Sequence, residues 1–416
     1  MVARAATTSL VPRSLIGPPL ARWSSPHDQR FPAASCRPPG EDRLVTNSAP
    51  TPTHPQVLAT ESLWLRDKRW DLTFISLSVV LVGFPIITYI FANQFSPQIS
   101  QLLRTMGSPF IWDDDASRNL VNGLIAIFIG GPHMYATFTR TAFDGEFTRK
   151  HKLVMGLSVL IPVGVVYFGV TSFQFLLTFF FFWASVHILH QIVFIMECYD
   201  KRSSQSLTPG ARLIDYAVVF SSLFPIATYK LVRGDFLIGQ NAIIFPEFLK
   251  VSAVFHLVSA AFAMALVLFV AKTIREIRQG LAHYPKILLM SLTIVVSFFI
   301  PAFRNLDVAF QGFNTWHSFQ YLGLTYYINR IRHEKGEISS RFIDQISREG
   351  KGWQYYFLNI GFTVLAIGLI LVLLMFRETL GLSFDQCYYI VVLSFLLMHY
   401  LHDHVLFTQP EAILTK

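Results

Sequence analysis

The stretch that decides the fold runs from residue 153 to residue 198. It reads LVMGLSVLIPVGVVYFGV (153–170), TSFQ (171–174) and FLLTFFFFWASVHILHQIVFIMEC (175–198). A helix that crosses a bilayer needs about 20 apolar residues, because it rises about 1.5 Å per residue through the hydrocarbon. The run is too long for one such helix, and its short polar interruption allows a hairpin. It therefore predicts two consecutive membrane-spanning helices.

The composition of the 416-residue chain agrees with this interpretation. Hydrophobic residues make up 52% of the chain and charged residues 14%, whereas soluble domains carry about 25% charged residues. These values exclude an ordinary soluble enzyme, a disordered protein and a collagen-like chain. The net charge of +8 does not indicate a nucleic-acid partner, because Lys and Arg lie in short groups between apolar runs. The three cysteines are far apart and predict neither a disulfide framework nor a Cys-based zinc site.

Further apolar runs of about the same length follow one another along the chain. We expect ten spans, near residues 72–94, 119–138, 153–171, 174–196, 213–231, 251–271, 287–303, 313–329, 355–376 and 387–408. The eighth is the most polar, since it contains Asn314, His317 and Gln320, and it must face the protein interior. The expected fold is an all-α, polytopic membrane helix bundle.

The distribution of Lys and Arg orients this bundle. If the N-terminus is cytoplasmic, the loops placed inside carry most of the positive residues, which is the usual asymmetry of membrane proteins. The pattern favours both termini in the cytoplasm and a multi-pass protein of the cytoplasmic (inner) membrane.

Residues 1–60 differ from the remainder, 61–416, which we expect to form the transmembrane helical domain. The segment holds ten of the 21 prolines, several Arg and few acidic residues. Proline fixes φ and removes a donor, so this composition predicts a disordered Pro/Arg-rich tail. A targeting segment of the transit-peptide kind and a dispensable tail are both compatible with it.

Several ionisable residues fall inside the predicted spans, where they are costly and mark functional sites. Counting about 1.5 Å per residue from the cytoplasmic helix ends places seven of them in the inner half of the membrane, on four helices. They are His133, His187, His190, His317, His399, His402 and Asp403. His256 lies on the outer side and is the exception.

The spacing of these residues places them on common helix faces. The i, i+3, i+4 arrangement, which aligns side chains on one face, occurs three times, in His187/His190/Gln191, His317/Gln320/Tyr321 and His399/His402/Asp403. His133 follows Gly130, Gly131 and Pro132, which we expect to thin or kink its helix and to let another element approach. Four polar helix faces should therefore converge.

Such a set of side chains is typical of a metal site. Neutral imidazole is the commonest metal ligand, and a His-rich set suits a transition metal. We expect iron, with haem held by two histidines as the alternative cofactor. The predicted ligands are the six histidines of the inner layer and Asp403, which can also orient a histidine. Gln191, Gln320 and Tyr321 are expected to bond to the ligands or to position a substrate. A polar network without a metal is the other interpretation.

The order of these motifs resembles the Brp/Blh family of bacterial membrane β-carotene dioxygenases. The matching positions are Gly130-Gly131-Pro132-His133, His187, His317, and His399 with Asp403. The resemblance implies a non-haem iron held by histidines of several helices, and cleavage or oxidation of an apolar polyene. The chain departs from the family pattern at Met134-Tyr135, at Tyr321, and in a His–Asp spacing that is one residue shorter.

We therefore expect a metal-dependent, oxygenase-like oxidoreductase that acts on a membrane lipid or isoprenoid. The alternatives are a proton or small-solute transporter and a non-catalytic membrane protein with a polar His/Asp network. The concentration of polar residues in the inner half favours the enzyme, because a transporter needs a path across the whole membrane. Arg140, seven residues after His133, has two interpretations: it binds a lipid phosphate, or it is an ordinary positive-inside anchor.

Overall fold

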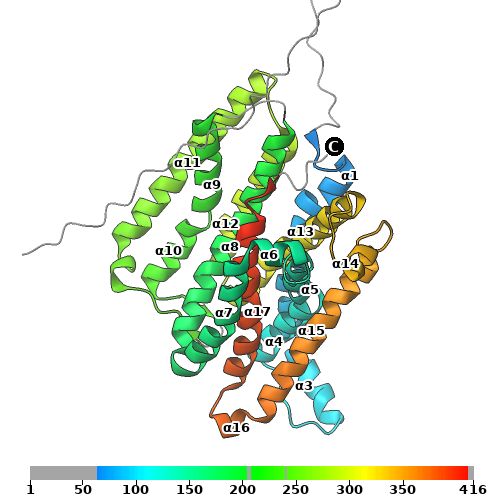
Figure 1. The fold of residues 1–416 in the computed structure, drawn as a ribbon. Helices are drawn as coiled ribbons and strands as arrows, with labels where there is room; N and C mark the ends of the chain where they lie inside the picture. The colour runs from blue at the N-terminus through cyan, green and yellow to red at the C-terminus, as the bar shows by residue number, and fades with distance from the viewer. Residues whose placement is uncertain (1–62, 204–207, 239–240, 411–416) are drawn as a thin grey trace, which may run out of the picture. The chain divides into compact units, whose positions relative to one another are not determined.

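The computed structural model describes residues 63–203, 208–238 and 241–410. These residues belong to one compact unit that begins at Val57. They are almost entirely helical (Figure 1), apart from the short antiparallel pair β1 (Leu237–Ile238) and β2 (Asn241–Ala242). The expected all-α fold is confirmed. The predicted tail, residues 1–60, lies outside the described residues.

Nine helical stretches among the described residues are long and apolar enough to cross a membrane, so the chain is an integral membrane protein. Five of them are single helices: α7 (Lys152–Thr171), α8 (Phe173–Arg202), α11 (Ser252–Arg278), α15 (Gly352–Met375) and α17 (Phe384–Leu406). The other four are built from consecutive helical segments: Lys68–Gln94 from α1 (Lys68–Trp70), η2 (Asp71–Ser76), η3 (Leu77–Val82) and α2 (Gly83–Gln94); Asp114–Arg140 from α4 (Asp114–Ile125), η4 (Ala126–Gly130), α5 (Gly131–Ala136) and η5 (Thr137–Arg140); Pro209–Arg233 from α9 (Pro209–Ser221) and α10 (Phe224–Arg233); and Tyr284–Ala302 from α12 (Tyr284–Phe299) and η7 (Ile300–Ala302). The other helices are α3 (Ser96–Thr105), α6 (Gly145–Lys150), η6 (Glu247–Leu249), α13 (Leu306–Glu334), α14 (Arg341–Ile346) and α16 (Arg377–Leu380).

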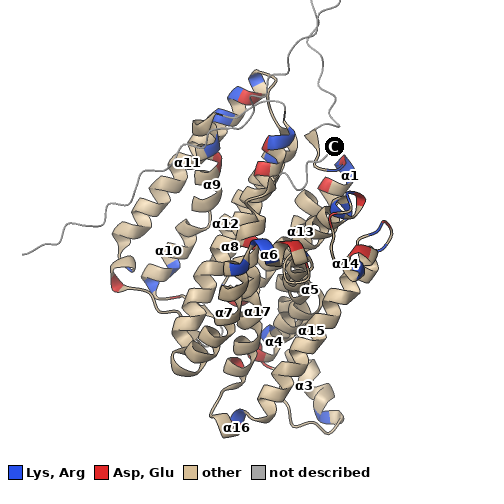
Figure 2. Cartoon of the chain, viewed as in Figure 1, with Lys and Arg blue, Asp and Glu red and all other residues tan. Residues whose placement is uncertain are grey.

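Charged residues are absent from the middle of several long helices. Figure 2 shows α15 without a charged residue, and α11 with charged residues only near one end. A helix that is apolar over this length cannot be covered by water at reasonable cost. The pattern is typical of segments that lie in the hydrocarbon of a bilayer.

The polar interruption within residues 153–198 forms a helix boundary, as predicted. Helix α7 ends at Thr171, Ser172 adopts a non-helical backbone, and α8 begins at Phe173. The two helices pack against each other. The long apolar run is therefore a hairpin of two spans.

Helix α13 contains the eighth expected span, residues 313–329, and is absent from the nine apolar stretches because of its polar residues. It lies inside the bundle, where Trp316 and Tyr321 are fully buried. It packs closely on the first span, since a Cβ on Gly323 would lie 2.6 Å from the Phe74 ring. Its interior position is the one expected from its polarity. The number of ten spans stays a prediction.

The helix that carries His133 changes its backbone geometry beside the glycines and the proline, and another helix approaches it there, as predicted. The kink itself stays a prediction. A π-helical turn, η4, ends at Gly130, two residues before Pro132. A Cβ on Gly131 would lie 2.5 Å from the side chain of Thr363, so α15 approaches the backbone closely at this point. The local shape places His133 on α5, directed into the bundle.

Candidate metal centre

Four histidine rings from four helices meet in the interior of the bundle. His133 comes from α5, His187 from α8, His317 from α13 and His399 from α17. The ring centroid of His133 lies 5.2 Å from that of His317 and 4.8 Å from that of His399. The ring centroid of His187 lies 5.0 Å from that of His317 and 4.9 Å from that of His399. Each of the four side chains is at most 4% exposed. The predicted convergence of four helices is thus present.

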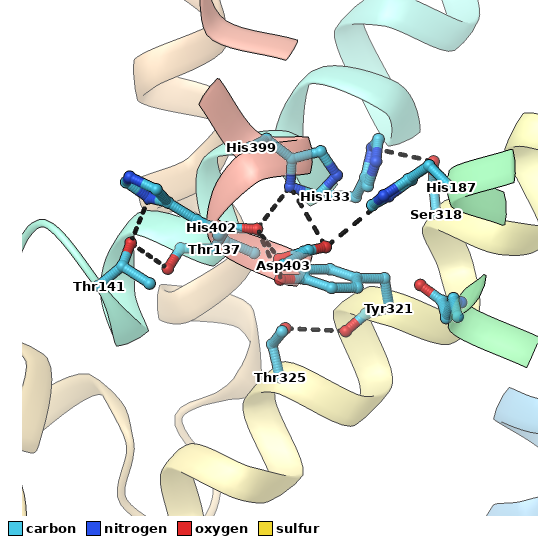
Figure 3. Close-up of polar contacts among 12 residues, drawn as sticks. His133, Thr137, Thr141, His187, Ser318, Tyr321, Thr325, His399, His402 and Asp403 are labelled. Carbon is cyan, nitrogen blue, oxygen red and sulfur yellow. Dashed lines mark hydrogen bonds and ion pairs between the residues drawn. The ribbon is translucent and has the colours of Figure 1, made fainter. Parts of the chain in front are cut away.

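Asp403 completes this group from α17, one turn after His399 (Figure 3). Its Oδ1 accepts hydrogen bonds from the Tyr321 hydroxyl at 2.5 Å and from Thr137 Oγ1 at 3.0 Å. Its Oδ2 faces His399 Nδ1 at 3.5 Å and His187 Nε2 at 3.8 Å. The carboxylate is fully buried, so one oxygen is held by hydroxyls while the other points to the imidazoles.

Hydroxyl groups also hold two of the imidazole rings. Ser318 Oγ lies 2.9 Å from His133 Nδ1, and Thr137 Oγ1 lies 2.6 Å from His399 Nδ1. In both rings the other nitrogen, Nε2, is left for another partner. This is how proteins orient histidines that ligate metals, with a hydrogen bond on the ring nitrogen that does not face the ion.

Six buried nitrogen and oxygen atoms at the centre have no hydrogen-bond partner among the described residues. They are His133 Nε2, His187 Nε2, His317 Nδ1, His317 Nε2, His399 Nε2 and Asp403 Oδ2. Buried polar atoms are normally paired, because an unpaired one loses its interaction with water without compensation. All six belong to residue types that bind metals. The residues therefore fit a transition metal ion.

Two overlapping sets of ligands are spaced closely enough for one ion. His133, His317 and His399 form one set, and His187, His399 and Asp403 form the other; within each set the ligand atoms lie within 4.8 Å of one another. Ligands about 2.0–2.2 Å from a metal lie roughly 3–4 Å apart, so modest side-chain movement closes either set. His399 is common to both.

The remaining two predicted ligands lie outside this group. His190 is partly exposed and contacts His404 and Phe407. His402 is buried, but Thr141 Oγ1 lies 2.9 Å from its Nδ1 and Ser158 Oγ 2.7 Å from its Nε2, so both nitrogens have partners. The structure does not bring either residue to the centre. His256, the expected exception, is exposed on α11.

The three residues predicted to support the ligands have different positions. Tyr321 bonds directly to Asp403. Gln191 donates to the carbonyl oxygen of His317 and to Gln320 Oε1, both at 3.1 Å. Gln320 donates to the carbonyl oxygen of Ile75 at 2.6 Å. The two glutamines therefore join α8, α13 and the first span behind His317.

The sequence interpretation did not include Thr137 and Ser318. Thr137 follows His133 by four residues, which is a signal available in the sequence because i and i+4 share a helix face. Ser318 is the last of four polar side chains that are joined in a row by hydrogen bonds. Gln311 donates to Asn122, Asn314 donates to Gln311, and Ser318 donates to Asn314 and contacts His133. No sequence spacing links Asn122 to this row, since it comes from α4.

A cavity of about 350 Å³ borders the centre at His133. His133, Met134 and Tyr135 form part of its wall, and the amides Asn122, Gln311 and Asn314 also line it. The rest is mostly apolar and comes from α8, α15 and α17, with residues such as Phe180, Ile367 and Leu396. Its size is that of a small-molecule site. The centre is thus open to an apolar space inside the bundle.

Comparisons with protein-family models, with curated proteins and with solved structures give no match to this chain. The resemblance to the Brp/Blh family stays a prediction.

Proposed function

We propose that this protein is a metal-dependent oxidoreductase of the membrane, that it uses non-haem iron, and that it acts on a lipid or isoprenoid. The observation that carries the proposal is the group of six unpartnered donor atoms on four histidines and Asp403. This group borders an apolar cavity. A purely structural polar network would be expected to satisfy its own hydrogen bonds.

In this proposal His133, His187, His317 and His399 hold the metal together with Asp403. The metal, when bound, supplies the redox and Lewis-acid chemistry needed to attack a C–H or C=C bond, which side chains alone do not activate. Thr137 and Tyr321 fix the carboxylate, and Ser318 fixes the His133 ring. The buried position of the group excludes water from the reacting atoms.

The close contact of the imidazoles favours a non-haem ion over haem. Haem with two axial histidines requires a flat space between two rings that is wide enough for the porphyrin. Here each of the four rings contacts two others, with centroids 4.8–5.2 Å apart. A single ion fits among these rings, whereas a porphyrin requires them to separate.

The cavity supports a lipophilic substrate. Its wall is formed mainly by aliphatic and aromatic side chains, and Asn122, Gln311 and Asn314 are the amides that line it. An apolar chain gains free energy from burial against such a wall, at roughly 25 cal/mol per Å². The amides can hydrogen-bond a hydroxyl or carbonyl end of the substrate. We therefore place the reacting part of the substrate beside His133.

Ten spans with both termini in the cytoplasm form the topology that we propose, in the cytoplasmic (inner) membrane. Helix α13 is the helix that would raise the number of spans from nine to ten. It supports this number because it runs alongside Asp114–Arg140. Near its start Asp307 accepts from Arg118 at 2.7 Å, and near its end Arg332 pairs with Asp144. If one of these helices crosses the membrane, so does the other. Reporters fused after Lys335 and at Asp113 should lie on opposite sides; the same side for both would contradict this topology.

The row Asn122, Gln311, Asn314 and Ser318 is the observation that favours a transporter instead. It joins one end of α4 to His133 by hydrogen bonds. Asn and Gln, however, carry no titratable proton, so the row cannot relay protons by itself. We therefore retain the enzyme as the proposal.

The test is a comparison of membrane lipids and of flux. Cells that express the wild type should accumulate an oxidised lipid or isoprenoid, and His187→Ala or His399→Ala should abolish it. His256→Ala is the matched control and should keep the product. Proteoliposomes should show no proton or solute flux. Flux lost in His187→Ala, with an unchanged lipid profile, would refute the enzyme and support the transporter.

A further inference from the structure

A second cavity, of about 530 Å³, lies at the C-terminal end of the Asp114–Arg140 span. Arg140 forms part of its wall, together with residues of α6, the C-terminal part of α13 and the C-terminal end of α17. In contrast to the first cavity, much of its surface is polar, and its charged lining includes Lys150, Arg332 and Lys335. This cavity plays no part in the function proposed above.

Arg140 is buried there without a partner. Its side chain is only 5% exposed, and its Nε is buried without a hydrogen bond. Among the described residues no ion pair or hydrogen bond is formed by its guanidinium. A buried charge is normally paired, because losing the solvation of an ion is costly. A positive-inside anchor would instead lie exposed among water and lipid headgroups.

The acidic residues of the cavity do not neutralise Arg140. Asp144 is paired with Arg332, and its other oxygen accepts from the Glu146 amide. Glu337 lies within 4.0 Å of Arg332 and within 3.9 Å of Lys335. The side chain of Glu146 is exposed. Arg140 is therefore a buried cation that forms no ion pair with any described residue, although the charge of the buried Asp403 also acts on it.

We propose that this cavity binds a phosphate group, with Arg140 as the principal contact. A guanidinium presents a planar set of donors that matches phosphate oxygens in pairs. Lys150 and Lys335 add positive charge around the same space. The phosphate belongs either to the headgroup of an anionic lipid or to a free phosphate compound, and both present the same oxygens to Arg140.

The experiment uses the full chain and two probes. Inorganic phosphate is titrated calorimetrically into detergent-purified protein at constant ionic strength, and the thermal stabilisation by phosphate is measured in parallel. Nanodiscs of phosphatidylcholine with a minor fraction of phosphatidic acid are then analysed by native mass spectrometry for retained phosphatidic acid. Saturable phosphate binding supports a free phosphate ligand, and selective retention of phosphatidic acid alone supports a lipid headgroup.

The variants identify the contact. Arg140→Gln should weaken the binding at least about tenfold, because a hydrogen bond to a charged group is stronger than an ordinary one. Arg140→Lys keeps the charge without the planar donors and should lose less. Arg149→Gln removes the same charge from an exposed position on α6 and should leave the binding unchanged. Equal effects of Arg140→Gln and Arg149→Gln would overturn the proposal. So would the absence of both phosphate binding and phosphatidic acid retention by the wild type, a result that needs no variant.

Discussion

Unpaired nitrogen and oxygen atoms are the residue-scale feature on which the account depends. Histidine and aspartate side chains in a membrane interior are costly, and hydrogen bonds among them would reduce that cost. Here Thr137, Ser318 and Tyr321 occupy the outer atoms of His133, His399 and Asp403. The inner atoms remain without partners. A metal ion in either set of three ligands would satisfy one atom from each residue of that set, which accounts for several ligand-type side chains at one point.

Thr137 contacts more members of the centre than any other hydroxyl named above. Its Oγ1 lies 2.5 Å from the Tyr321 hydroxyl, 2.6 Å from His399 Nδ1 and 3.0 Å from Asp403 Oδ1. We predict that Thr137→Val, which keeps the shape, lowers the metal affinity about 10–100-fold, as the loss of such supporting bonds does elsewhere. Competition with a chelator measures this affinity.

The matched control for Thr137 is one helical turn away. Thr141→Val removes a hydroxyl that contacts His402 rather than the centre. It should leave the metal affinity within about twofold of the wild type, because no ligand depends on it. An equal loss in both variants would mean that His402 belongs to the metal site.

At the scale of elements, much of the fold could be predicted from hydrophobic patterning. The break at residues 171–174 and the close approach of another helix beside His133 both follow from local residue types, and both are present. The interior position of α13 followed from its polar residues, since these cannot face lipid. The two-residue strand pair could not be predicted in this way, because so short an element has no period.

The close packing at Gly131 can be tested by adding a Cβ atom at this position. An added Cβ would lie 2.5 Å from both Thr363 and the carbonyl oxygen of Ala126. We predict that Gly131→Ala lowers the free energy of unfolding by about 1–3 kcal/mol, the usual cost of overpacking. Thermal melting in detergent measures the change. Gly361→Ala on α15 is the control, because nothing lies within 4 Å of its added Cβ. A smaller loss at Gly131 than at Gly361 would contradict the close packing.

The start of α12 should respond to pH. His283 caps this helix by accepting a hydrogen bond from the Lys286 amide, and it is buried beside the Lys286 ammonium. Burial, and then the charge of Lys286, lowers the pKa of His283 from 6.5 to about 4. As the pH decreases from about 6.5 towards 4, the imidazole of His283 binds a proton in the unfolded chain but not in the folded one. The free energy of unfolding therefore falls over this pH range.

We predict that this fall costs at most about 3.4 kcal/mol, from a pKa shift of roughly two and a half units at 1.36 kcal/mol each. His283→Asn keeps a capping side chain without a titrating ring, so its melting temperature should fall less than that of the wild type over the same pH range. The comparison of the two proteins removes the contribution of other titrating groups. Parallel pH curves for both would show that His283 is not the cause.

At the scale of the whole molecule, the sequence predicted a convergence that depends on long-range packing. Depth along each span and the face of each helix were sufficient to predict that His133, His187, His317, His399 and Asp403 belong together. They were not sufficient to exclude His190 and His402, because residues three apart differ by about 60° around a helix axis. Whether such a neighbour joins the centre depends on what the adjacent helices present to it. For His402 the adjacent helices present Thr141 and Ser158.

The arrangement of the two cavities is also a property of the whole molecule. The apolar cavity and the polar cavity involve different parts of the helix that carries His133, with His133 in the wall of one and Arg140 in the wall of the other. We propose the first as the site of an apolar substrate and the second as the site of an anion. Their separation allows substrate binding and anion binding to be tested independently, each with its own variants.

The most direct test of the central claim is the metal content of the purified protein. Wild-type protein, purified in detergent without added metal, should contain close to one equivalent or more of a transition metal, with iron predominant, by inductively coupled plasma mass spectrometry. The combined variant His133→Ala, His187→Ala, His317→Ala and His399→Ala should lose it, whereas His256→Ala and His402→Ala should keep it. Wild-type metal content equal to that of the combined variant, with both proteins folded, would contradict the account.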